Sequence, residues 1–263
     1  MIQRWILTGD THGQFSRFEN LDRTPNTAVI ILGDAGLNYH GDERDKAAKK
    51  YLSKFPHTFY CVKGNHEMRP GKVHSMHLVK DPDVGGVVWV EEEFPNIRYF
   101  CDWGFYYIDG MKTLVIGGAY SVDKHYRLQN GWKWFEDEQL QTHDMKACEY
   151  ALWYDKDIDL VLSHTCPLSL QPTDAFLSVI DQSTVDNTME TWMEKISNTI
   201  RWKYWLWGHY HIDRIEWPHC ECFYKEMEPL TDIIDRWNKY DETGKLDWWL
   251  PLSPKMKRIM EEK

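Results

Sequence analysis

Five short blocks rich in glycine, histidine, aspartate and asparagine recur along the chain, and each directly follows an apolar run. In chain order they are Gly9-Asp10-Thr11-His12-Gly13, Gly33-Asp34, Gly64-Asn65-His66-Glu67, Ser163-His164 and Gly208-His209-Tyr210-His211. Short apolar runs that end at glycine are typical of buried strands. We therefore expect five buried strands, each followed by a loop with side chains that can do chemistry.

The segments between these blocks predict further helices and strands. A helix is expected over residues 42–55, because this stretch is rich in helix-forming residues and Pro56 ends it. Short strands separated by turn residues follow it. Expected strands are 84–91, 97–101, 105–108, 112–116, 212–217 and 220–227, and expected helices are 138–154, 185–200 and 231–240. This pattern predicts a layered α/β sandwich formed by one domain over residues 1–263, with 229–263 as a packed C-terminal tail.

Charge and composition exclude several classes of protein. The formal net charge is −10, whereas proteins that bind extended nucleic acid usually present clustered Lys and Arg. No apolar run approaches the roughly 20 residues that a membrane-spanning helix needs. The six cysteines include no C-x-x-C pair, and no signal-peptide pattern precedes the first strand. We expect a cytoplasmic protein without a membrane segment.

The polar residues of the five blocks are the types that bind metal ions. Asp10 and His12, and likewise His209 and His211, are two positions apart, so in extended chain both members of a pair would face one side. Oxygen and imidazole donors without thiolate favour Mn, Fe or Zn. A single such residue is more often a hydrogen-bonded core or turn residue than a ligand. Five blocks in order, each after a buried strand, favour a metal site.

Taken together, the blocks D-x-H, GD, GNHE, SH and GH-x-H resemble the signature of the calcineurin-like metallophosphoesterase family over about residues 5–215. The resemblance implies two mixed β-sheets flanked by helices. The first and third blocks are similar to those of the Ser/Thr phosphoprotein phosphatase branch. That branch carries GD-x-x-DRG in the second block, where this chain reads Gly33-Asp34-Ala35-Gly36-Leu37-Asn38. The chain therefore departs from the protein phosphatases.

The resemblance also implies a role for each residue of the blocks. Asp10, His12 and His211 would hold one divalent ion, Asn65, His164 and His209 a second, and Asp34 would bridge both. Two ions about 3.5 to 4 Å apart can share a hydroxide that attacks phosphorus. His66 would protonate the leaving oxygen or polarise a phosphoryl oxygen. Mn is the first expectation for the two ions, with Fe or Zn as alternatives.

Four cations near the blocks are candidates for contacts with the substrate phosphate. Lys63 precedes the third block and Arg69 follows it, while His125 and Arg127 lie in a loop after the strand expected at 112–116. Lys63 and Arg69 could equally be solvated surface cations. Trp132 and Trp134 could stack a nucleobase, although packing is the more common use of such residues.

These observations favour a metal-dependent phosphoesterase that acts on a phosphorylated small molecule, nucleotide or phosphopeptide. Both monoesters and diesters fit the pattern. One alternative is a nuclease or nucleotide phosphodiesterase of the same superfamily. Another is a catalytically silent scaffold that binds a protein partner, because a fold alone does not determine function. No feature of the sequence indicates an oligomeric state.

Overall fold

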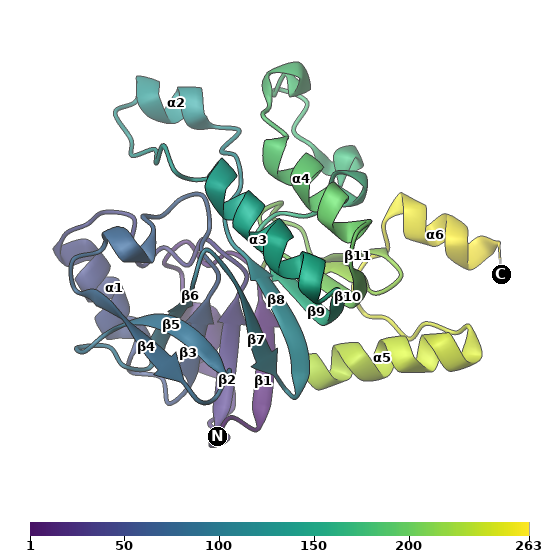
Figure 1. Cartoon of the computed structure of the whole chain (residues 1–263), viewed down its shortest axis with the longest axis horizontal. Coiled ribbons are helices and arrows are strands. Elements are labelled where there is room, and N and C mark those ends of the chain that lie inside the picture. Colours follow the sequence, from purple (N-terminus) through teal and green to yellow (C-terminus); the bar gives the residue numbers. More distant parts are fainter. Residues whose placement is uncertain (263) are drawn as a thin grey trace.

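The computed structural model describes residues 1–262 and contains two mixed β-sheets (Figure 1). The first has seven strands in the order β13-β1-β2-β3-β6-β5-β4. They are β1 (Arg4–Thr8), β2 (Thr27–Ile31), β3 (Thr58–Cys61), β4 (Met76–Asp81), β5 (Gly86–Glu91), β6 (Ile97–Phe100) and β13 (Met227–Pro229). The second has six strands in the order β11-β12-β10-β9-β8-β7. They are β7 (Trp103–Ile108), β8 (Met111–Ile116), β9 (Asp157–Ser163), β10 (Arg201–Trp207), β11 (Arg214–Trp217) and β12 (Cys220–Cys222).

The centre of each sheet is parallel. In the first sheet β1, β2 and β3 pair in parallel, and in the second β8, β9 and β10 do the same. Parallel strands that are buried on both faces read as continuous apolar runs, as these do in the sequence. Their carboxyl ends meet at one edge of each sheet. All five polar blocks follow such strands, namely β1, β2, β3, β9 and β10.

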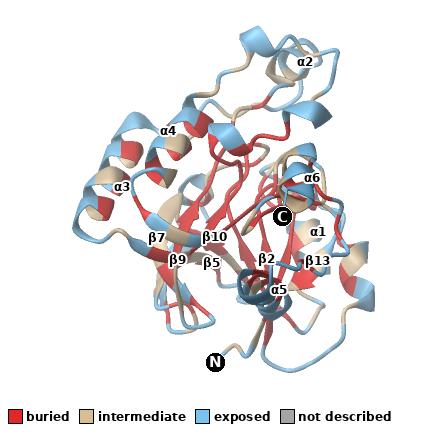
Figure 2. Cartoon of the chain, turned by 90° about the vertical axis from the view of Figure 1, so that its right-hand side faces the viewer, coloured by how far each residue is buried: buried red, intermediate tan, exposed pale blue. Residues whose placement is uncertain are grey.

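Three apolar layers hold the sheets together and confirm the predicted sandwich. The inner layer joins the two sheets, with Leu7 and Ile30 from the first sheet and Leu162 and Leu206 from the second. Alternate residues of the same strands, such as Val29, face an outer layer because side chains alternate along a strand. Each such buried side chain stabilises the fold by roughly 1.5–3 kcal/mol. Figure 2 shows this buried interior in red, mainly along the strands.

Residues 1–262 include six α-helices, and most of them pack against the sheets. They are α1 (Glu43–Leu52), α2 (Lys124–Gln129), α3 (Thr142–Tyr154), α4 (Thr188–Ser197), α5 (Leu230–Thr243) and α6 (Pro254–Glu261). The buried residues of α3 and α4 pack on the outer face of the second sheet. Helix α1 begins at its cap Asp42, whose carboxylate accepts a hydrogen bond from the Arg44 amide at 2.9 Å. Within residues 1–262, no helix has both the length and the apolar character needed to cross a bilayer.

Residues after 229 pack onto the sheets rather than extending away from them. Trp237 of α5, Leu250 and Met256 of α6 are all buried in the inner apolar layer. Helix α6 was not expected from the sequence, yet its start has ordinary signals: Ser253 caps the Met256 amide at 3.0 Å and Pro254 occupies the first turn.

The strand expected over residues 220–227 is wrong, because the chain passes from one sheet to the other within it. Residues Cys220–Cys222 form β12 in the second sheet, and Met227–Pro229 form β13 in the first. Between them, the Asp213 carboxylate accepts hydrogen bonds from the amides of Tyr224 and Glu226 at 2.6 and 3.1 Å. These bonds replace ladder bonds and turn the chain.

Candidate metal centre and adjoining cavity

The loops after the strands place the polar side chains by sharp turns rather than by extended backbone. The extended conformation expected for the first and fifth blocks is wrong. Four predicted ligands have positive φ angles: His12 at 46°, Asp34 at 47°, His209 at 68° and His211 at 52°. Such angles are uncommon for residues other than glycine and are concentrated at functional sites.

Asp10, His12 and His211 come together as one group of ligand atoms. The Nε2 atoms of His12 and His211 lie 2.9 Å apart, and the His211 Nε2 lies 3.1 Å from Asp10 Oδ2. The His12 Nε2 lies 3.7 Å from the same carboxylate oxygen. Distances of about 3–4 Å between donor atoms are what neighbouring ligands show when each lies about 2.0–2.2 Å from one ion.

Asn65, His164 and His209 form a second group. Asn65 Oδ1 lies 2.7 Å from His164 Nε2 and 3.1 Å from His209 Nδ1. The other ring nitrogen of His164, Nδ1, donates to the Leu32 carbonyl at 2.8 Å. This bond orients the ring and leaves the Nε2 lone pair facing Asn65, as metal-binding histidines require.

Asp34 lies between the two groups. Its Oδ1 is 3.7 Å from His164 Nε2 of the second group, and its Oδ2 is 4.0 Å from His12 Nδ1 of the first. The amide of His66 donates to Oδ1 at 2.8 Å and holds the carboxylate in place. The structure thus brings together all seven residues that the sequence proposed as ligands.

The donor set fits divalent metal ions. The Oδ2 atom of Asp10 is buried and has no hydrogen-bond partner among the described residues, a costly state for a carboxylate oxygen unless a cation or water satisfies it. The paired nitrogens of His12 and His211 face each other at 2.9 Å, where a shared ion would satisfy both. Asp10, His12 and His211 are one possible ion-binding group, and Asp10, Asp34 and His164 are another.

Protonation states in the centre also suit a metal. Burial raises the pKa of Asp34, but the His66, His164 and His12 imidazoles outweigh it and lower that pKa overall. Burial also raises the pKa of Asp10, but the close imidazoles of His211 and His164 outweigh it and lower that pKa overall. Burial lowers the pKa of His209 to about 3. Both carboxylates are therefore ionised and His209 is neutral at pH 7, which are the forms that bind metals.

Two glycines allow these loops to approach one another. A Cβ atom at Gly33 would lie 1.9 Å from His164 Nδ1, and one at Gly64 would lie 1.9 Å from Asp34 Oδ1. Both distances are far inside contact range. Glycine is therefore required in these blocks because a neighbouring ligand occupies the space of its missing side chain.

Ser121 and Glu138 support the centre and had no signal in the sequence. Asn65 Nδ2 donates to Ser121 Oγ at 2.8 Å, and the Ser121 hydroxyl in turn donates to the Glu138 carboxylate at 2.5 Å. This chain of hydrogen bonds determines which end of the Asn65 amide faces the histidines. Neither residue stands in a recognisable block, so only their spatial position reveals the role.

His66 belongs to neither ligand group and faces the cavity. Its Nε2 lies 3.8 Å from Asp34 Oδ2 and accepts a hydrogen bond from Arg127 Nη2 at 3.3 Å. Burial lowers the pKa of His66 despite the nearby Asp34 carboxylate. Arg127 is itself held by the Asp123 carboxylate at 2.8 Å. The structure thus places one predicted phosphate-binding cation, Arg127, beside His66.

The other three predicted phosphate contacts are held elsewhere or exposed. Lys63 is buried, and its ammonium donates to the carbonyls of Glu138 at 2.8 Å and Asp137 at 3.2 Å. The Arg69 guanidinium is held by the carboxylates of Asp102, Asp137 and Asp144. His125 is exposed on α2. The cations at 63 and 69 are engaged in structural contacts, which sequence spacing did not reveal.

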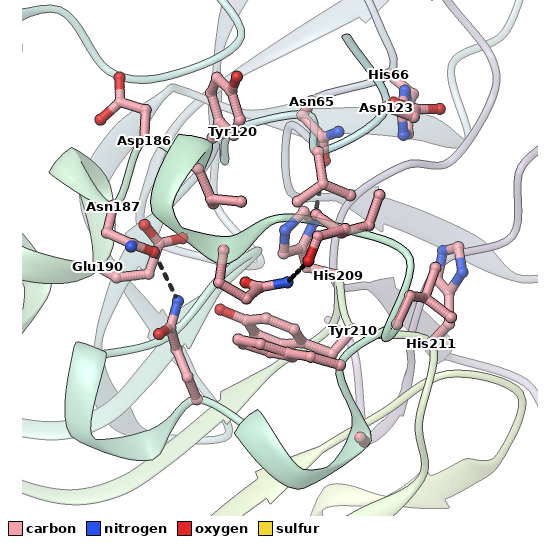
Figure 3. A pocket seen from close by; sticks show the side chains of 18 of the residues that line it. Asn65, His66, Tyr120, Asp123, Asp186, Asn187, Glu190, His209, Tyr210 and His211 are labelled. Carbon is pink, nitrogen blue, oxygen red and sulfur yellow. Dashed lines mark hydrogen bonds between the residues drawn. The ribbon is translucent and has the colours of Figure 1, made fainter. Parts of the chain in front are cut away.

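A cavity of about 290 Å³ adjoins the candidate centre (Figure 3). Asp34, Asn65, His66, His209 and His211 line it on the side of the strand-end loops. We call residues 171–187 the outer wall; nine of them line the cavity from the opposite side. They are Gln171, Ala175, Phe176, Leu177, Ile180, Gln182, Val185, Asp186 and Asn187. The cavity volume is close to that of sites for small molecules.

Several solved structures are similar in fold at low identity. TT1561 of Thermus thermophilus shares 13% identity with a TM-score of 0.46, over 87% of this chain and 98% of that one. Phosphopantetheinyl hydrolase from Mycobacterium tuberculosis shares 12% identity with a TM-score of 0.46, over 92% of this chain and 93% of that one. The 5'-nucleotidase from Candida albicans shares 13% identity with a TM-score of 0.41, over 98% of this chain and 56% of that one. Likeness at this level says nothing about substrate or mechanism.

The family of this chain is shown by its sequence. No curated protein matches the chain. The sequence profile of calcineurin-like phosphoesterases, in contrast, matches residues 4–213, a range that includes all five polar blocks. This match confirms the resemblance seen in the motifs: the chain belongs to the calcineurin-like phosphoesterase family.

Proposed function

We propose that this protein hydrolyses phosphate esters with the help of two divalent metal ions. The observation that carries the proposal is the arrangement of two ligand groups on either side of one carboxylate. Asp10, His12 and His211 would hold one ion, Asn65, His164 and His209 the other, and Asp34 both. Two such ions, Mn first and Fe or Zn as alternatives, supply a water of lowered pKa and positive charge at the phosphoryl oxygens.

The residues of the chain then supply orientation and proton transfer. His66 lies at the cavity, outside both ligand groups, so it acts on the substrate by polarising a phosphoryl oxygen or, after it has taken up a proton, by protonating the leaving oxygen. Arg127, whose Nη2 lies 3.3 Å from His66 Nε2, can offer hydrogen bonds to the same phosphoryl group. Asp34 keeps the His66 backbone fixed through the bond at 2.8 Å.

The cavity favours a small phosphorylated substrate over a nucleic-acid strand. Its volume of about 290 Å³ fits one small alcohol portion. The net charge of −10 works against an extended polyanion. The complete set of ligands, together with His66, favours an enzyme over a silent scaffold. Phosphomonoesters and small phosphodiesters, including nucleotides and phosphopeptides, remain the candidate substrates.

The test is hydrolysis of para-nitrophenyl phosphate and bis-para-nitrophenyl phosphate by metal-stripped protein resupplied with Mn, Fe or Zn. We expect turnover that depends on the added metal, and the better substrate distinguishes a monoesterase from a diesterase. Folded protein that binds the metals yet hydrolyses neither compound would contradict the proposal and favour a binding role for the fold.

A further inference from the structure

The far side of the cavity combines apolar side chains with two carboxylates and contains no predicted metal ligand. Phe176, Leu177 and Ile180 of the outer wall (residues 171–187) contribute apolar surface there. Asp186 and Glu190 add carboxylates, and no lysine or arginine is among the described residues that line the cavity. In Figure 3, Asp186 and Glu190 lie on the left, across the cavity from His66 and His211. This side therefore contacts whatever alcohol carries the phosphate.

Glu190, in the first turn of α4, is a buried carboxylate with one unused oxygen. The residue is 3% exposed. One oxygen, Oε1, accepts a hydrogen bond from Thr165 Oγ1 at 2.7 Å, and Thr165 is held in turn by the Tyr210 hydroxyl at 2.9 Å. The other oxygen, Oε2, is buried and has no hydrogen-bond partner among residues 1–262. The side chain is thus fixed at the cavity with a free acceptor.

A buried acceptor without a partner is costly, and a ligand that satisfies it gains affinity. Leaving such a group unpaired costs on the order of 1–3 kcal/mol, and more when it is charged. Burial raises the pKa of Glu190 to about 7, so the carboxyl is ionised above that pH. There a ligand that donates an N–H to Oε2 removes this cost and forms a charge-assisted hydrogen bond. An apolar ligand of the same shape leaves Oε2 without a partner and gains no such affinity.

The surrounding charges determine which donors fit. Asp186 also lines the cavity on this side, so a second anionic group on the substrate would meet the carboxylates of Asp186 and Glu190. Asp123 lies beside His66 on the metal side, where it is paired with Arg127 at 2.8 Å. Like charges in a partly enclosed site repel strongly. An amino group, by contrast, would be attracted to both Asp186 and Glu190. The apolar residues Phe176 and Leu177 suit a hydrocarbon or aromatic portion between the phosphate and that group.

We infer that Glu190 is a specificity-determining residue that accepts a hydrogen bond from an amino or amide N–H on the alcohol portion of the substrate. The substrate class is therefore a phosphate ester with an apolar body and a nitrogen donor, and without a second anionic group. This inference rests on the proposed function, because it places the phosphate at the metal centre.

Three aryl phosphates that differ only at the far end of the ring test the inference. The probes are 4-(2-aminoethyl)phenyl phosphate, 4-ethylphenyl phosphate and 4-(2-carboxyethyl)phenyl phosphate. We expect kcat/KM to fall in that order, with the amine favoured over the ethyl compound by about tenfold or more. In Glu190→Gln the ratio of kcat/KM for the amine to kcat/KM for the ethyl compound should fall by about tenfold. In Glu194→Gln, a change in the same helix outside the cavity lining, the ratio is kept.

Binding of the product alcohols separates this inference from the proposed function, because it needs no catalysis. Tyramine should bind wild-type protein about tenfold more tightly than 4-ethylphenol in calorimetric titrations, and Glu190→Gln should lose this preference. If no phosphate ester is hydrolysed but tyramine binding depends on Glu190, the proposed function fails and the subsite stands. Equal binding of the two alcohols by wild type, or a preference that survives in folded Glu190→Gln, overturns the inference.

Discussion

The two sides of the cavity are held in opposite ways. Groups of the metal side are fixed by partners far along the chain: His164 by the Leu32 carbonyl, the His209 amide by Asp10, and the His66 amide by Asp34. In the outer wall (residues 171–187), short 3₁₀ turns are joined mainly by local bonds, such as those of Asp181 to Ser183 and Thr184.

This difference separates the parts that do the chemistry from the parts that select the substrate. The bonds of His164 and His209 join the two sheets, and that of His66 joins neighbouring loops of one sheet, so the packing of the sheets keeps the ligands in position. Local turns with exposed side chains open at low cost and tolerate substitution. We therefore expect changes at the metal side to abolish the reaction, and changes at the outer wall to alter which ester is accepted.

The largest effect should come from Asp34→Asn. Removing the charge of the carboxylate between the two ligand groups should weaken metal binding and lower kcat/KM on the order of 10⁴-fold or more. Metal content after dialysis measures the metal binding, and hydrolysis of para-nitrophenyl phosphate measures kcat/KM. The matched control is Asp81→Asn in β4, a buried aspartate that binds Tyr60 and Arg98 outside the cavity. Equal activity of the two variants would refute a special role for Asp34.

His66→Gln should lower kcat by about 10²-fold or more while metal content stays constant, because His66 belongs to neither ligand group. The measurement is kcat beside metal analysis of the same preparation. His57→Gln, at a buried histidine whose Nε2 lies 2.8 Å from the Asp22 carbonyl, is the control. Loss of metal from His66→Gln would instead assign His66 to the ligand set.

Phe176→Ala should show the milder behaviour of the outer wall. The ring stacks on Tyr210 with centroids 6.0 Å apart, so its loss should raise KM for para-nitrophenyl phosphate roughly three- to tenfold. Methyl phosphate, which has no aryl group, should be hydrolysed as before. Leu168→Ala, at an exposed residue outside the cavity lining, is the control. A fall in kcat for both substrates would place Phe176 in the chemistry.

The smallest effect concerns stability and pH. Burial raises the pKa of Glu190 from 4.5 to about 7. A carboxyl group with a raised pKa takes up a proton on folding, so its contribution is present below pH 4.5 and is lost as the pH rises to about 7. Over this window the unfolding free energy of wild type should fall relative to Glu190→Gln, on the order of 1–3 kcal/mol. Parallel urea denaturation curves would contradict this assignment.

The metal side was predictable from sequence because its signal is local. Each block follows an apolar strand, and parallel strands end at a common edge, so Asp10, Asn65 and His164 had to lie near one another once the sheets formed. The same reasoning predicted a layered α/β sandwich, and the resemblance to the phosphoesterase family implied its two mixed sheets. It did not predict the left-handed turns at His12 and His211, since alternation along a strand does not extend into its loop.

The rest depends on contacts that leave no pattern in sequence. Ser121 and Glu138 orient Asn65 from a loop without a motif, and Glu190 looks like any acid near the start of a helix. Lys63 illustrates the reverse error: its place beside a block suggested a phosphate contact, but its ammonium binds two backbone carbonyls. The direction in which a long side chain points is determined by its packing, and the spacing of residues along the sequence does not reveal it.

A crystal structure of the protein grown with Mn²⁺, with anomalous data collected at the manganese edge, tests the central claim most directly. We predict two anomalous peaks about 3.5 to 4 Å apart, one beside each ligand group and both within reach of the Asp34 carboxylate. A single peak, or peaks that leave Asp34 or the group of Asn65, His164 and His209 unliganded, would contradict a two-metal centre.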